Sequence, residues 1–323
     1  MPSQILRRAL AACLFTCAAL PLHAQSPVGG ERTVRSAVVA QQSGPSFLES
    51  IAVGPDKAIY VTDFHGRQIL KYVDDKGFTV HARLDVHPWG LVFDNDGTMY
   101  FGAAEEDIVD KRSPPTQLIY RQAPGDPVPT RLLRIEQAKA LNGMTLLAPG
   151  RILLADARGG VIWHLDLKTG AASRFLQDDL LDAPANFQLP TPAANGLKIH
   201  AGYLYVSNTA RVAMLRVRIG DDLKPAGGVE VYADAVRADD FVFSPAGNLY
   251  YTTHRKEVMR ITPDRRISEV AGIGPELIGS TALAWRQGDD GPFAINDGGF
   301  IAHHWYGGPA PAASNLVRLR GLD

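Results

Sequence analysis

The sequence predicts an all-β protein, a six-bladed β-propeller that occupies residues 25–323 as a single domain. Three observations support this. One motif recurs six times, most copies contain a hairpin of short strands, and 31 glycines and 22 prolines are spread along a chain with few long amphipathic helical periods. Repeats of this kind are typical of propellers, in which each repeat supplies one blade.

The six repeats have starts 40 to 53 residues apart, a spacing that suits four-stranded blades with some insertions. They begin near residues 49, 89, 142, 195, 239 and 280. In most of them a short strand, a polar turn and a second strand follow one another, as in 53–61 and 243–251, and a third strand and a weaker fourth come next. A β-sandwich or a pair of β-domains is the alternative, but neither repeats one motif at this period.

The segment 33–41 precedes the first repeat and has the composition of a strand. We expect it to supply the outermost strand of the last blade and so to close the ring.

The N-terminus predicts a signal peptide over residues 1–24. Arg7 and Arg8 are followed by an apolar run over 9–22 and by a small-residue cleavage site near Ala24. The run is too short for a membrane anchor, so we expect a soluble, exported protein in the periplasm or outside the cell. A lipoprotein signal ending at Cys13 and a twin-arginine signal are weaker alternatives.

Composition limits the partners and the chemistry. The formal net charge is −1 and no basic block is present, which argues against nucleic acid as a partner. Both cysteines lie in the predicted signal peptide, so the mature chain has no thiolate for zinc or for nucleophilic catalysis. The expected partner is a small molecule, and the sequence leaves the oligomeric state open.

Polar residues open the first strand of four repeats. These residues are Glu49, Asn142, Asn195 and Asp239, and Trp89 and Ser280 hold the same position in the other two. Because the first strand of every blade lines the central channel, these side chains should meet on the axis. Two carboxylates and two amide oxygens suit calcium better than magnesium, and suit zinc poorly. The alternative is that the Asn-Gly and Asp residues merely form turns.

The same residues resemble the family of senescence marker protein (regucalcin), gluconolactonases and related lactone hydrolases. The likeness covers nearly all of the mature chain and includes the motifs Leu-Asn-Gly-Met, Ala-Asn-Gly-Leu-Lys and Asp-Asp-Phe. It implies that Glu49, Asn195 and Asp239 hold a catalytic divalent ion beside Asn142. The more distantly similar paraoxonases imply Asp240 as a fifth ligand. Ala140 and Asp240 depart from the sugar lactonases, which argues against gluconolactone as the substrate.

The resemblance implies a metal-dependent hydrolase of lactones or related esters. Asp239 is the expected general base, with Asp240 second, and Trp89, Asn142, His87 and His254 are expected to line the substrate pocket. The two histidines are further candidates for the base. No Gly-x-Ser-x-Gly elbow and no mature cysteine are present, so direct attack by water is favoured over an acyl-enzyme.

Two other functions stay open. One is ring formation or condensation in secondary metabolism without a metal, as in relatives of strictosidine synthase, which lack the full set of four polar residues. The other is a non-catalytic, exported binding protein in which the ion only holds the blades together.

Overall fold

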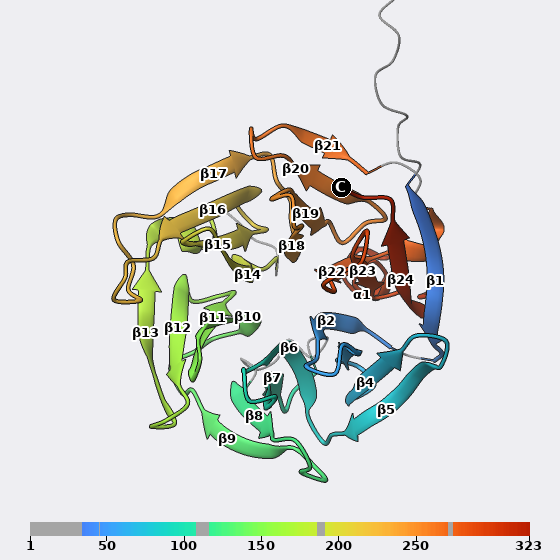
Figure 1. Cartoon of the computed structure of the whole chain (residues 1–323), viewed down its shortest axis with the longest axis horizontal. Coiled ribbons are helices and arrows are strands. Elements are labelled where there is room, and N and C mark those ends of the chain that lie inside the picture. The colour runs from blue at the N-terminus through green and yellow to red at the C-terminus, as the bar shows by residue number, and fades with distance from the viewer. Residues whose placement is uncertain (1–33, 45, 108–115, 186–190, 271–273) are drawn as a thin grey trace, which may run out of the picture. The chain divides into compact units, whose positions relative to one another are not determined.

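The computed structural model describes residues 34–44, 46–107, 116–185, 191–270 and 274–323. Its strands form six four-stranded antiparallel sheets, which are arranged as blades around a central axis (Figure 1). The prediction of a six-bladed β-propeller is therefore confirmed. The predicted signal peptide, residues 1–24, lies outside the described part of the chain. None of the described helices is long and apolar enough to cross a membrane.

Each blade runs outward from the axis in chain order, apart from the last. The strands of blades 1 to 3 are β2 (Leu48–Val53), β3 (Ile59–Asp63), β4 (Gln68–Val73) and β5 (Gly77–Arg83); β6 (His87–Phe93), β7 (Met99–Ala104), β8 (Leu118–Gln122) and β9 (Thr130–Arg134); and β10 (Leu141–Ala148), β11 (Arg151–Asp156), β12 (Val161–Asp166) and β13 (Ala171–Gln177).

The strands of blades 4 and 5 are β14 (Ala194–His200), β15 (Tyr203–Asn208), β16 (Ala213–Arg218) and β17 (Glu230–Asp234); and β18 (Phe241–Phe243), β19 (Leu249–Thr252), β20 (Val258–Ile261) and β21 (Ile267–Glu269). Short helical segments interrupt the loops: η1 (Asp179–Leu181), η2 (Pro275–Leu277) and α1 (Phe300–Tyr306).

The last blade joins the two ends of the described chain. It contains β22 (Ser280–Ala284), β23 (Phe293–Asn296), β24 (Ser314–Arg320) and β1 (Arg35–Gln42), with β1 outermost. The pairing of β1 with β24 is antiparallel and sets Arg35 opposite Arg320. The expected ring closure by the segment near 33–41 is thus present.

The core lies between the blades. Each of six buried apolar clusters combines residues from two neighbouring blades, as Ile51 and Val61 of blade 1 do with Phe293 and Leu316 of blade 6. A single sheet cannot bury both of its faces, and stacking the sheets around an axis supplies each face with a partner.

Acidic side chains at the ends of second strands hold the loops on one face. Asp63 accepts hydrogen bonds from the backbone of Phe47 and Gly66, and Asp156 accepts them from the backbone of Lys139 and Ala140. A buried carboxylate with several backbone donors fixes the connections that lead into the first strands.

Candidate functional site

We call Glu49, Asn142, Asn195 and Asp239 the polar ring residues. Three of them occupy irregular positions in first strands. In β2, β10 and β14 the pairing with the second strand shifts at the point that contains Glu49, Asn142 and Asn195, respectively. A β-bulge bends its strand and redirects the side chain of the extra residue. The Asn-Gly pairs therefore lie within strands. Asp239 comes just before β18 and donates its backbone N–H to the carbonyl of Thr252.

The alignment of the sequence repeats is off by one residue in the last blade, as a bulge in β22 shows. The pairing of β22 with β23 shifts between Ser280 and Leu283, and Thr281 lines the axial cavity. The Ser280 hydroxyl instead donates to the carbonyl of Glu257, away from the axis. Ser280 is thus the counterpart of Leu141 and not of Asn142.

Glycines that follow the ring residues let neighbouring first strands approach closely. A Cβ atom on Gly143 would lie 2.2 Å from the carbonyl oxygen of Asn195, and a Cβ atom on Gly90 would lie 2.1 Å from that of Asn142. On Gly196 it would lie 2.4 Å from an Asp240 carboxylate oxygen. These glycines are needed for contact between backbones, and they bring the side chains of separate blades together.

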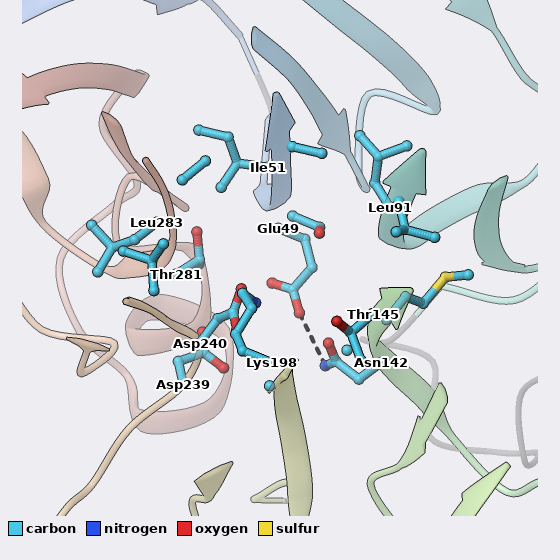
Figure 2. Close-up of a pocket in the computed structure, with 18 of the residues that line it drawn as sticks. Glu49, Ile51, Leu91, Asn142, Thr145, Lys198, Asp239, Asp240, Thr281 and Leu283 are labelled. Atoms are coloured by element: carbon cyan, nitrogen blue, oxygen red, sulfur yellow. Dashed lines mark hydrogen bonds and ion pairs between the residues drawn. The ribbon is translucent and has the colours of Figure 1, made fainter. Parts of the chain in front are cut away.

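The ring borders a cavity of about 280 Å³ on the axis. All four polar ring residues line it, and the first strands continue its wall with Ile51, Leu91, Met144 and Leu283. Figure 2 shows Glu49, Asn142 and Asp239 converging from different blades, with Glu49 directed toward Asn142. We call this space the axial chamber.

Hydrogen bonds link the four polar ring residues in two pairs. Asn142 Nδ2 donates to Glu49 Oε1 over 3.1 Å, and Asn195 Nδ2 donates to Asp239 Oδ1 over 2.5 Å. Glu49 is 7% exposed and Asp239 is 3% exposed. The second oxygen of Asp239 lies 2.8 Å from Nε2 of His254. The second oxygen of Glu49 is buried and has no hydrogen-bond partner.

The buried charges shift one another. Burial, followed by the negative charge of Asp239, raises the pKa of Glu49 to about 8. Burial raises the pKa of Asp297 to about 6. For His254, burial favours the neutral ring, but the Asp239 carboxylate outweighs it and raises the pKa to about 9. With all of its carboxyls ionised, the site would hold more negative charge than its own cationic side chains neutralise.

The residues fit a hard divalent cation. Glu49 and Asp239 offer carboxylate oxygens, Asn142 and Asn195 offer amide oxygens, and one Glu49 oxygen is buried without a partner. No group of three or more His, Cys, Asp or Glu side chains that could hold a metal ion occurs in the described ranges. The candidate centre therefore depends on its amide oxygens, and its ligand set differs from those of zinc sites, which are rich in thiolates or imidazoles.

Asp240 points into the axial chamber and is already paired. Its two oxygens lie 2.7 and 2.9 Å from Nζ of Lys198, on β14. Burial raises the pKa of Asp240 even with this ammonium group beside it. Both oxygens of Asp240 are thus paired with the ammonium group of Lys198, which neutralises the charge of this carboxylate.

His87 and Trp89 of blade 2 were predicted to line the pocket, but neither is among the described residues that line the axial chamber. His87 is 1% exposed, with Nδ1 bound to the carbonyl of Phe64 and Nε2 accepting from Arg67 Nε. Both ring nitrogens are engaged, so His87 offers none to a ligand. Trp89 is 8% exposed and packs on Phe64 with ring centroids 4.2 Å apart, in an aromatic cluster that includes Phe300.

His254 differs from His87 in its exposure and in the partners of its ring nitrogens. Its side chain is 23% exposed, and its buried Nδ1 has no hydrogen-bond partner. The backbone at His254 is in the left-handed region, with φ 58°, and its N–H donates to the carbonyl of Ser280. This conformation, unfavourable for a residue with a side chain, holds the imidazole against Asp239.

Comparisons with known proteins give a clear fold and a weak sequence match. No model of a known protein family matches the chain. The chloroplast protein SUPPRESSOR OF QUENCHING 1 of Arabidopsis thaliana is 26% identical over 137 residues, which are 42% of this chain and 12% of that protein. The match thus spans about one eighth of the relative.

Three solved structures share the fold over nearly the whole chain. A luciferin-regenerating enzyme has a TM-score of 0.65 at 12% identity and covers 90% of this chain and 95% of its own. The calcium-binding protein regucalcin of Agrobacterium tumefaciens has a TM-score of 0.62 at 15% identity, and the match covers 88% of this chain and 95% of that one. A gluconolactonase of Xanthomonas campestris has a TM-score of 0.61 at 16% identity, and the match covers 88% of this chain and 90% of that one. Identities this low show the fold alone.

Proposed function

We propose that this protein is a hydrolase of lactones or related esters that depends on a divalent cation, and that the cation is calcium. One observation carries the proposal: two buried carboxylates and two amides from four blades converge on one axis, with an unpartnered Glu49 oxygen among them. Such a set is stable only with a cation or with added protons. Structures named regucalcin and gluconolactonase share the fold, which supports the proposal by analogy.

The residues have distinct roles in this proposal. Glu49, Asn142, Asn195 and Asp239 would hold the cation, which when bound supplies a Lewis acid for the ester carbonyl. The hydrogen bonds from Asn142 and Asn195 would orient the two carboxylates, and the second oxygen of Glu49 is left without a hydrogen-bond partner. Ile51, Leu91, Met144 and Leu283 would supply an apolar wall for the substrate.

Proton transfer is assigned to the Asp239–His254 pair. As water attacks the carbonyl carbon, its O–H bond breaks and the proton passes to the carboxylate of Asp239, whose Oδ2 lies 2.8 Å from Nε2 of His254. The acyl C–O bond then breaks and the same proton goes to the departing alkoxide, which leaves a hydroxy acid from a lactone. Asp240 takes no part, because Lys198 holds both of its oxygens.

The test is hydrolysis of a panel of aliphatic and aromatic lactones and esters, before and after chelation, with calcium, magnesium, manganese or zinc added back. We expect turnover that chelation abolishes and calcium restores best. Asp239→Asn and His254→Gln should lower kcat at least a hundredfold. Asp234→Asn, which removes an exposed carboxylate in β17, is the matched control and should leave kcat unchanged.

Two outcomes would count against the proposal. Cation binding without turnover of any panel member would reject the hydrolase and favour an ion that only holds the blades together. Turnover that chelation leaves intact would reject the metal-dependent mechanism.

A further inference from the structure

Lys198 is the cationic side chain of the axial chamber wall, and the proposed mechanism gives it no role. It lies on β14 three residues beyond Asn195, and its side chain is 27% exposed. Figure 2 shows its side chain beside Asp240, at the edge of the polar ring. The ammonium group also lies 5.4 Å from the centroid of the Phe241 ring, which is fully buried.

Asp240 is an additional carboxylate at a crowded position. Blades 2, 3 and 4 have Gly90, Gly143 and Gly196 after the ring residue, whereas blade 5 has Asp240 after Asp239. The Asp240 side chain uses the space that the missing Cβ of Gly196 leaves. The Asp240 side chain is only 18% exposed, so its charge needs a nearby counter-charge, and Lys198 supplies it at 2.7 and 2.9 Å.

The charges of this group add up to those of one divalent ion. Ionised Glu49, Asp239, Asp240 and Asp297 carry four negative charges, and the Lys198 ammonium and a cationic His254 cancel two of them. We propose that Lys198 is a specificity-determining residue, whose tethered positive charge neutralises Asp240 and sets the axial site for one divalent cation in preference to a trivalent one. The inference rests on the cation of the proposed function but not on hydrolysis.

Coulomb's law gives the pattern that distinguishes this role from a merely structural one. The repulsion between the ammonium and a bound cation scales with the charge of the cation, so every change in log affinity should be about 1.5 times larger for a trivalent than for a divalent ion. His254 and Asp297 also bear on the site, but they are the same in every variant and cancel in the comparison.

The experiment measures dissociation constants of Ca²⁺ and Tb³⁺, each added alone to the chelator-treated full-length protein, for K198M, D240N and the double variant. K198M should bind Ca²⁺ roughly tenfold more tightly and Tb³⁺ about thirtyfold more tightly. D240N should weaken binding of Ca²⁺ roughly tenfold and binding of Tb³⁺ about thirtyfold. The double variant should return to within about twofold of the unmutated protein for both ions. Lys224→Met, at an exposed lysine outside the chamber, is the control and should change neither constant.

D240N keeps the test decisive if K198M folds poorly. Asparagine has nearly the same shape as aspartate, and the substitution leaves the Lys198 ammonium without its counter-charge. Equal Ca²⁺ affinity for D240N and the unmutated protein would overturn the inference, and so would equal shifts for the two ions. The predicted pattern without hydrolysis of any lactone would support the inference and reject the hydrolase. Absence of any cation binding by the unmutated protein would overturn both.

Discussion

Replacing Glu49 by Gln should stabilise the cation-free protein at high pH and abolish its stabilisation by calcium. The glutamine keeps an oxygen to accept the hydrogen bond from Asn142 and removes the negative charge that burial and Asp239 oppose. The same change removes a charged ligand from the proposed centre. A single substitution should therefore have opposite effects in the two states.

The magnitude follows from the pKa of Glu49, which rises from 4.5 to about 8. A carboxyl with a raised pKa in the folded protein loses stability as pH rises from its unfolded value through its folded value. Full ionisation would cost about 5 kcal/mol of unfolding free energy, and relaxation of the surrounding dipoles should reduce this to about 2 kcal/mol. For a chain of this size, that corresponds to roughly 4 °C in Tm.

The assay is thermal unfolding of both proteins at pH 5 and pH 8.5, with chelator or with excess calcium. With chelator, the Tm of Glu49→Gln should exceed that of the unmutated protein slightly at pH 5, just above the unfolded pKa of 4.5, and by more at pH 8.5. Calcium at a hundred times its dissociation constant should stabilise only the unmutated protein, by about 2.7 kcal/mol. Glu269→Gln, at an exposed carboxylate, should change neither result. A chelated Glu49→Gln protein that is less stable at pH 8.5 would refute the electrostatic argument.

Three further substitutions test the frame of the site by chemical unfolding. Gly143→Ala should cost at least about 2 kcal/mol, because its Cβ would overlap a carbonyl oxygen, whereas Gly228→Ala, with open space around it, should be nearly neutral. Asp156→Asn should cost about 2 kcal/mol, since an amide cannot accept all of the loop's hydrogen bonds. Arg286→Met should cost about 1 kcal/mol by breaking the ion pair with Asp74 that joins blades 6 and 1.

The fold and most of the ring could be predicted from the sequence because a repeat gives the same position in each blade the same environment. Alignment of the repeats was enough to place Glu49, Asn142, Asn195 and Asp239 around one axis. It was also enough to assign the N-terminal strand to the last blade, since an unmatched strand before the first repeat has no other partner.

The sequence could not give the residues whose orientation depends on strand pairing. Regular alternation would turn Lys198 away from the axis, because it lies an odd number of positions after Asn195. The bulge in β14 adds a residue between them and reverses that alternation. The same effect separates Ser280 from Thr281. The role of His87 depends on its contacts with Phe64 and Arg67, and neither adjoins it in the sequence.

The pairing of β1 with β24 has a consequence for how the molecule forms. During synthesis from the N-terminus, β1 emerges first, and its partner, β24, is the last strand to appear. Until then β1 is an unpaired edge and the sixth blade is incomplete, so ring closure depends on a contact between the ends of the described chain. Such non-local pairing is slow, and the open ring exposes strand edges to other chains in the meantime. The β1–β24 pairing that stabilises the finished propeller is therefore also the pairing whose late formation leaves the folding chain open to aggregation.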